Sequence, residues 1–164
     1  MKLLLDTTYF LPSIGVGVRN VPRTLARDLR VRGYNISICT ITIFELAAKG
    51  AKFISEGKLG DNQVREGIQA ILSDENINQV AFQDPIILTR AMNLRSTVND
   101  FIDCLILGAA ATTAEALVSE DEELQEMMLQ DEIRAKLKPI NPDFNIYSSR
   151  TVPLSSRGER KILP

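Results

Sequence analysis

The chain has 164 residues, of which 45% are hydrophobic and 24% are charged, and its formal net charge is -2. This describes one globular domain with a sizeable core and excludes a disordered or fibrous chain, while the small net charge means that any nucleic-acid role requires a local basic patch. The absence of histidine excludes Ser/His and Cys/His nucleophile pairs, histidine general bases and zinc sites built on histidine.

The amino-terminal run and the cysteines indicate a cellular setting. Asp6 interrupts the apolar start MKLLLD well before the length of a signal peptide or a membrane span. Cys39 and Cys104 both lie in apolar runs, as small core residues do in a reducing compartment. We therefore expect a cytoplasmic protein without a disulfide framework or a membrane contact.

The first half of the chain alternates apolar runs with helical patterns. Residues 2–5 are typical of a buried parallel strand, and a passage rich in Pro and Gly follows them. The leucine spacing after that passage predicts a helix over 24–33 that closes at Gly33. The next predicted elements are a strand at 35–40, a helix at 42–58, and a helix at 61–73 with Val64, Ile68, Ile71 and Leu72 on one side.

The second half continues the alternation. Its predicted elements are a strand at 77–82, a helix at 84–95, a helix containing NDFIDCLILGAA, a strand at 115–120, one acidic helix at 121–137 and an extended piece at 138–146. Strands that alternate with helices favour a mainly parallel sheet covered on both faces. From about residue 148 the chain loses periodicity and gains Ser, Arg and Pro, which predicts a domain over 1–147 and a flexible or partner-ordered tail over 148–164.

Acidic residues stand near the carboxyl ends of the predicted strands. Asp6 closes the first strand, Glu45 lies just inside the helix after the second, and Asp121 follows the strand at 115–120. Asp100 and Asp103 are three residues apart and share a helix face. Because ligand sites of parallel sheets gather outside the carboxyl ends of the strands, these acids are expected to converge.

Each acid also has a purely structural interpretation. Thr42 and Glu45 have the spacing of a capping box. Asp121 can cap the acidic helix, and Asp6 can open a turn. Similar helix-start roles apply to three further residues: Asn99, Asp100 and Asp103.

Taken together, four or five acids on one rim point to a cation. Their repulsion in a partly buried cleft amounts to several kcal/mol unless a cation or raised pKa values relieve it. Oxygen donors without histidine suit Mg²⁺ or Mn²⁺. A carboxylate-held divalent ion is the usual means of activating water against a phosphodiester.

Four segments, LLLDTTYFL, TIFELA, NDFIDCLILGAAA and ALVSEDEEL, resemble the four acidic motifs of PIN-domain ribonucleases. KPINPDFNI is similar to the last strand of that fold, so the resemblance covers residues 1–147. It implies an α/β fold, a three-layer α/β/α sandwich around a central, mainly parallel sheet. It also implies a Mg²⁺- or Mn²⁺-dependent endoribonuclease that leaves 5'-phosphate and 3'-hydroxyl ends. The best-populated branch is the toxin half of VapBC-type pairs, in which an antitoxin occupies the groove and toxins commonly dimerise.

The resemblance assigns roles to individual residues. It makes Asp6, Glu45 and Asp103 the core metal ligands and catalytic acids, completed by Asp121 directly or through water. Asp100 becomes an accessory acid. Two hydroxyls, those of Thr8 and Ser119, are expected to hydrogen-bond the carboxylates and fix their rotamers.

RNA binding requires positive charge, and one basic stretch offers it. Five arginines lie within fourteen positions that contain a single acid, Asp28; they are Arg19, Arg23, Arg27, Arg30 and Arg32. A rim that follows phosphates is the functional interpretation, and a solvated helix face is the alternative. The tail adds Arg150, Arg157, Arg160 and Lys161, and the candidates for base stacking are Tyr9, Phe10 and Tyr34, of which Phe10 fits core packing equally well.

Other functional classes stay open. The region 50–73 is long for a compact toxin, and the tail extends past the last strand, so an RNA-processing PIN protein carries the same acids; a short upstream reading frame with a DNA-binding start would favour the toxin. A PIN-like module that binds RNA or protein without catalysis is the alternative from another class. A haloacid-dehalogenase-type phosphatase ranks low, because its chemistry needs a second aspartate where Thr8 stands.

Overall fold

The computed structural model describes residues 1–19 and 21–153. This part of the chain holds a five-stranded sheet in the order β3-β2-β1-β4-β5, in which every neighbouring pair is parallel. The strands are β1 (Lys2–Leu5), β2 (Asn35–Cys39), β3 (Ile77–Val80), β4 (Ala116–Val118) and β5 (Asn145–Tyr147). The chain leaves β1 toward β2 on one side and returns to β4 on the other, so the carboxyl end of β1 is a topological switch point.

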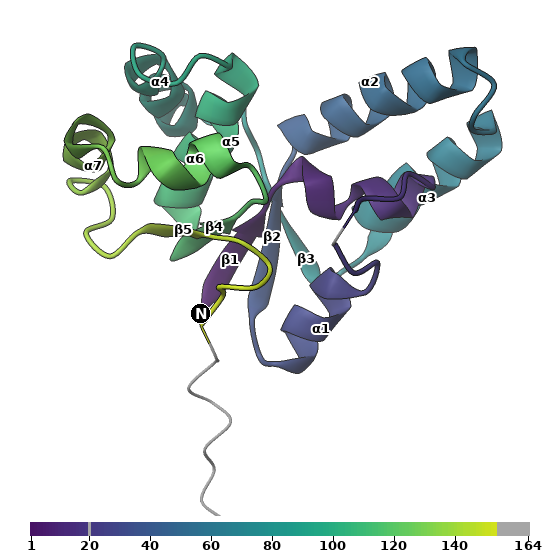
Figure 1. Ribbon diagram of the computed structural model, residues 1–164, viewed down its shortest axis with the longest axis horizontal. Helices are drawn as coiled ribbons and strands as arrows, with labels where there is room; N and C mark the ends of the chain where they lie inside the picture. The colour runs from purple at the N-terminus through teal and green to yellow at the C-terminus, as the bar shows by residue number, and fades with distance from the viewer. Residues whose placement is uncertain (20, 154–164) are drawn as a thin grey trace, which may run out of the picture.

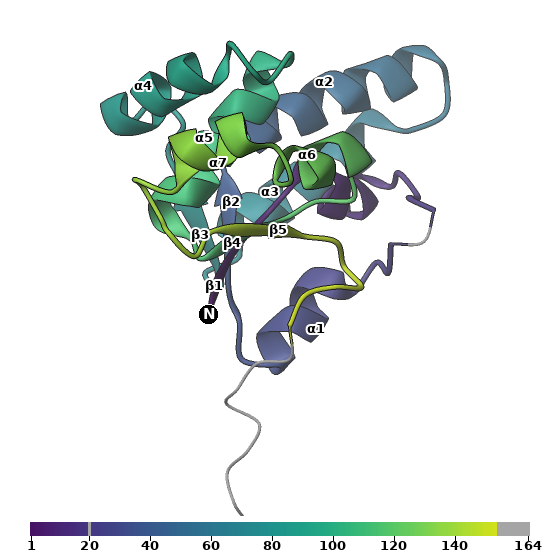
Figure 2. The ribbon, with the colours of Figure 1, turned by 60° about the vertical axis from the view of Figure 1, so that its left-hand side comes forward.

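Helices cover both faces of this sheet (Figures 1 and 2). They are the 3-10 helices η1 (Thr7–Tyr9) and η2 (Leu11–Ile14), then α1 (Leu25–Val31), α2 (Ile41–Ser55), α3 (Asp61–Ser73), α4 (Pro85–Leu94), α5 (Phe101–Thr113), α6 (Glu122–Met127) and α7 (Asp131–Leu137). The alternation of β1 separates two cores: Leu4 faces one with α4, α5, α6 and α7, and Leu3 and Leu5 face the other with η1, η2, α1 and α3. The expected three-layer α/β/α sandwich is confirmed.

Helix α5 is buried on most of its surface, which fixes the position of its first turn. Residues 104–111 are all buried. At Gly108 an added Cβ would lie 3.3 Å from the carbonyl oxygen of Ile87 and 3.4 Å from the amide nitrogen of Ala91. Small residues therefore let α5 pack closely against α4 and hold Asp103 at the edge of the sheet.

Helices α2 and α3 form an arm that projects from the sheet (Figure 1). The bounds predicted for the 61–73 helix are confirmed, but the face predicted for it is partly wrong: Leu72 is 45% exposed, and Gly67 is buried instead. A Cβ at Gly67 would lie 2.1 Å from the carbonyl oxygen of Ser13. The backbone of α3 thus packs directly on η2 and anchors the arm beside the end of β1.

The acidic segment 121–137 is not one helix, as the sequence predicted, but two. Helix α6 ends at Met127 and α7 starts at Asp131, with Leu129 79% exposed between them. Leu124 and Ile133 are both buried, yet nine residues of α-helix turn through about 900°, which puts the two side chains on opposite sides of a straight helix. The break lets both reach the core.

The carboxyl-terminal part of the described chain stays on the domain. The amide of Ser149 donates to Glu120 over 2.8 Å, and Val152 packs against the core of Leu3 and Leu5. Three basic residues of the tail that were proposed for RNA binding lie outside the described residues: Arg157, Arg160 and Lys161. Within residues 1–19 and 21–153, the helices are all too short or too polar to cross a membrane.

Candidate active site

Asp6 lies where β1 ends and is the most buried of the candidate acids, with 9% of its surface exposed. Its Oδ1 accepts a 2.7 Å hydrogen bond from the amide of Thr7, and its Oδ2 accepts a 2.9 Å bond from the hydroxyl of Ser119. The first bond caps η1, so the turn expected at Asp6 is present. The second bond joins the ends of β1 and β4, which fixes the carboxylate at the switch point.

Glu45 comes from the second turn of α2 and is bound by Thr7. The Thr7 hydroxyl donates a short hydrogen bond to Oε2 of Glu45 and lies 3.3 Å from the hydroxyl of Thr42. The capping box proposed for Thr42 and Glu45 is wrong, because α2 starts at Ile41 and has no side-chain cap. The hydroxyl expected from Thr8 also comes from Thr7, and Thr8 makes no hydrogen bond to Asp6 or Glu45.

Asp100 and Asp103 mark the start of α5. Asp100 is the N-cap, and its Oδ1 accepts a 2.7 Å bond from the amide of Ile102. Asp103 follows in the first turn and is partly buried. The helix-start role of Asp100 is therefore present, and it brings a second negative charge beside Asp103.

Asp121 caps α6 while standing next to the Asp6 site. Its Oδ1 accepts bonds of 2.8 Å and 3.3 Å from the amides of Glu123 and Leu124. Its own amide donates to the Ser119 hydroxyl over 3.1 Å. Ser119, fully buried, thus links Asp6 to Asp121 as the expected carboxylate-holding hydroxyl.

Three of the acids have raised pKa values, from burial and from the charges of their neighbours. Burial raises the pKa of Asp103 to about 7, with further upward contributions from Asp100, Asp6, Asp121 and Glu45. Burial also raises the pKa of Asp6 and of Glu45 above their ordinary values, although their hydrogen bonds and the nearby charge of Lys49 act in the opposite direction. The structure therefore brings these acids into one electrostatic unit, as the order of the strands predicted.

The donor set suits a hard divalent cation in chemistry but is not closed around one. No three acids in residues 1–19 and 21–153 stand close enough to enclose a metal ion with their present side-chain positions. The donors are carboxylate oxygens, and their mutual repulsion is what a cation relieves. Asp103 and Oδ2 of Asp121 accept no hydrogen bond in the described part of the chain, so Asp103 can turn toward an ion and Asp121 has one oxygen left to offer.

The predicted arginine rim does not meet the acids. Helix α1 lies at the amino ends of the strands, near the chain's amino terminus (Figures 1 and 2). Arg30 forms a two-pronged ion pair with Asp74, at 2.8 Å and 3.0 Å, just before the amino end of β3. Arg23 and Arg27 are exposed on or beside α1, and Arg19 lies in the loop before it.

The aromatic residues proposed for base stacking are in the core. Tyr9, Phe10 and Tyr34 are each at most 5% exposed, so none offers a face to a base. The Tyr9 hydroxyl instead donates to Glu120 over 2.8 Å. Although burial raises the pKa of Glu120, its bonds from Ser149 and Tyr9 and the charge of Arg150 hold it below the ordinary value. Glu120 therefore accepts hydrogen bonds from both η1 and the segment after β5.

Two residues at the site were missed from the sequence. The sequence pattern does not indicate Thr7, because a continuing strand would point residues 6 and 8 to one face and residue 7 to the other. Lys49 carries a positive charge that acts on both Asp6 and Glu45, and its spacing of four residues from Glu45 on a helix is the signal that could have found it.

Replacing Thr7 by Val is expected to weaken binding of Mg²⁺ or Mn²⁺ about 10- to 100-fold, as loss of a carboxylate-orienting partner typically does. The change keeps the shape of the side chain but removes the donor to Glu45. Calorimetric titration with Mn²⁺ measures the effect, with Thr8→Val as the matched control. Equal losses in both variants would contradict the role of Thr7.

Fold and site define a class: a three-layer α/β protein with an acidic site at the switch point of a parallel sheet. The model of the PIN domain family matches residues 3–128, which is most of the chain. The protein belongs to the PIN domain family, whose members are generally nucleases.

Among solved structures, the chain is similar to one chain of the crystal structure of VapBC2 from Rickettsia felis bound to a DNA fragment from their promoter. The TM-score is 0.57 at 20% sequence identity, and the match covers 90% of this chain and 98% of that one. At this identity the likeness establishes the fold. No curated protein matches the sequence.

Proposed function

We propose that the protein is an endoribonuclease that hydrolyses RNA phosphodiester bonds with Mg²⁺ or Mn²⁺. The proposal rests on the convergence of four acids: Asp6, Glu45, Asp103 and Asp121. The charges of the other three contribute to the raised pKa of Asp103. Membership of the PIN domain family supports nuclease activity as the use of these acids. The same four residues are the proposed catalytic and metal-binding set, with Asp100, Ser119 and Thr7 in accessory roles.

The hydrogen bonds that hold each acid indicate which role it has in the proposed reaction. When bound, a divalent cation would lower the pKa of a water molecule and offset negative charge at phosphorus. Asp6 and Glu45 are fixed by the bonds from Thr7 and Ser119, so they serve as the rigid ligands. Asp103 is free to turn, which suits it to complete the ligand set or to accept the proton of the attacking water. Attack in line with the 3' oxygen would leave a 5'-phosphate and a 3'-hydroxyl.

The proposal includes protein partners. The fold shared with a VapBC2 structure supports a role for this protein as the toxin of a toxin–antitoxin pair. Its two protein partners would be a small antitoxin and a second copy of the chain. Ile86 and Met92 on α4 are 55% and 63% exposed, and a contact with another chain there would cover them. Sedimentation of the chain alone and with the product of a neighbouring short reading frame tests both partners.

The wild-type protein is expected to cleave a fluorescent, unstructured RNA in Mn²⁺ and in Mg²⁺ and to lose this activity in EDTA. The reason is that four carboxylates cannot activate water against a phosphate without a cation. Gel analysis of the products and of their end groups provides the measurement. Cleavage that persists in EDTA, after the protein has been freed of metal, would contradict the proposal.

One observation favours a second candidate, a PIN-like module that binds RNA or protein without cleaving it. No three acids in the described chain are arranged to hold an ion. Calorimetry separates the candidates, because the nuclease binds Mn²⁺ and the module does not. Absence of both cleavage and metal binding would establish the module.

A further inference from the structure

The side of α2 that borders the acids carries two lysines. Lys49 and Lys52 follow Glu45 at spacings of four and seven residues, which puts all three on one stripe of the helix. Both lysines are exposed. Each helical turn advances about 5.4 Å, so the two ammonium groups lead outward from the acids along the projecting arm.

Neither lysine forms a salt bridge within the described part of the chain, although the hydrogen bond from Lys58 and, to a smaller extent, the charge of Lys52 lower the pKa of Glu56. An ion pair on the arm joins Lys58 to Glu56, and among residues 1–19 and 21–153 no carboxylate lies within 4.0 Å of the ammonium group of Lys49 or Lys52. Lys49 nevertheless stands near enough to lower the pKa of both Asp6 and Glu45. A cation that is close to the site but unpaired can take a phosphate oxygen without first breaking a salt bridge.

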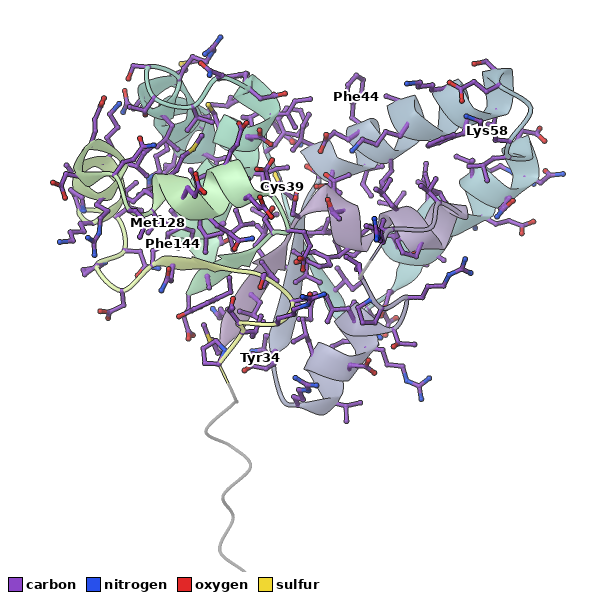
Figure 3. All side chains as sticks on the ribbon, viewed as in Figure 1. Tyr34, Cys39, Phe44, Lys58, Met128 and Phe144 are labelled. Carbon is purple, nitrogen blue, oxygen red and sulfur yellow. The ribbon has the colours of Figure 1, made fainter. Side chains whose placement is uncertain are left out.

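The helices that carry Glu45 and Asp103 also expose aromatic rings. Phe44, directly before Glu45, is 63% exposed, and Phe101, between the two aspartates of α5, is 39% exposed. Figure 3 shows Phe44 on the side of α2 turned away from α3. A single exposed ring needs no explanation. Phe44 lies about 100° around α2 from the stripe of Glu45, Lys49 and Lys52, and exposed rings together with cations are the features that bind single-stranded nucleic acid.

We propose that α2 is the element that binds the substrate strand: Lys49 and Lys52 contact phosphates of single-stranded RNA, and Phe44 stacks on a base. The inference rests on the proposed function, because it names the substrate form and its path to the acids. The arginines of α1 lie away from this path, at the amino ends of the strands (Figure 1), where Arg30 is also paired with Asp74. A solvated helix face is the alternative, and it predicts no effect of the lysines on RNA binding.

Binding of a fluorescent, unstructured RNA measured by anisotropy in EDTA tests the inference without cleavage. The full-length variants are Lys49→Gln with Lys52→Gln, Phe44→Ala, and Arg23→Gln with Arg27→Gln as the matched control of equal charge change. For two lost phosphate contacts, the slope of log affinity against log salt is expected to decrease by about 1.4. Phe44→Ala is expected to weaken binding about fivefold or more without changing that slope. The arginine variant is expected to behave as wild type.

An unchanged salt slope in the lysine variant would overturn the inference. If the arginine variant alone loses affinity, the strand runs over α1; if neither loses affinity, the α2 face serves another purpose, such as a protein contact. Failure of the proposed nuclease function gives a different result. The wild-type protein would then leave the RNA uncleaved in Mn²⁺, while its binding of RNA in EDTA would still depend on Lys49 and Lys52.

Discussion

Replacing Asp103 by Asn is expected to reduce metal-dependent RNA cleavage about a thousandfold, because it removes a carboxylate ligand and proton acceptor together worth several kcal/mol of transition-state stabilisation. Asn keeps the size of the side chain and the start of α5, which Asp100 caps. Single-turnover cleavage rates in saturating Mn²⁺ provide the measurement.

The matched control is Asp143→Asn, which removes an exposed acid in the turn before β5 and is expected to retain full activity. Asp6→Asn is expected to be as inactive as Asp103→Asn. If Asp6→Asn abolished cleavage while Asp103→Asn kept it within tenfold of wild type, Asp103 would have no place among the ligands or proton acceptors.

In EDTA, the wild-type protein is expected to lose stability relative to Asp103→Asn as pH rises from about 4 to about 7. The pKa of Asp103 is raised from its ordinary 3.8 to about 7 in the folded chain, so the folded state binds this proton more tightly than the unfolded state. The stability that this proton provides is complete below the unfolded pKa and is lost as pH rises through the folded one. Because solvent reaches part of the side chain, the expected loss is about 1–3 kcal/mol rather than the full value of the shift.

Urea unfolding of both proteins across this pH range measures the difference, in which the titration of carboxylates distant from Asp103 cancels. Above about pH 7, where Asp103 is ionised, Asp103→Asn is expected to be the more stable protein in EDTA. Saturating Mg²⁺ is expected to reverse that order, because the ion stabilises the folded state that binds it. A difference that stays flat with pH would contradict the raised pKa.

The positions of the strands and of the acids could be predicted because both follow from simple rules. Short apolar runs between helical patterns defined β1 to β4, and parallel strands place all their carboxyl ends on one edge. Asp6, Glu45 and Asp121 follow such ends closely in the sequence. Their proximity to one another could therefore be predicted without knowing the positions of the side chains. The capping of α5 by Asp100 and of α6 by Asp121 also showed that a helix-start role and a place in the acidic cluster are compatible.

The hydroxyl partner of Glu45 could not be predicted, since it depends on where β1 stops. An extended chain would turn residue 8 to the side of Asp6, but the chain enters η1 directly after Asp6 and brings Thr7 there instead. That turn is set by packing of Tyr9 and Phe10 in the core, which no local pattern specifies.

The break between α6 and α7 and the position of Arg30 were predictable in principle. Leu124 and Ile133 are incompatible with one buried face of a straight helix. Arg30 precedes the amino end of β2 by a few residues, and that end lies opposite the acids in a parallel sheet. Both features follow from how separate parts of the chain are placed relative to one another, which the residue pattern within a single helix or strand does not show.

The hydrogen bond between Asp6 and Ser119 spans 113 residues of sequence, and this has a consequence for the nascent protein. Strand β4 and Ser119 follow β1 far along the chain, so the Asp6 carboxylate lacks its bond from Ser119 until that later part has been made. Such a contact of high sequence separation forms late. We expect a chain that ends before Ser119 to carry Asp6, Glu45 and Asp103 without an ordered site.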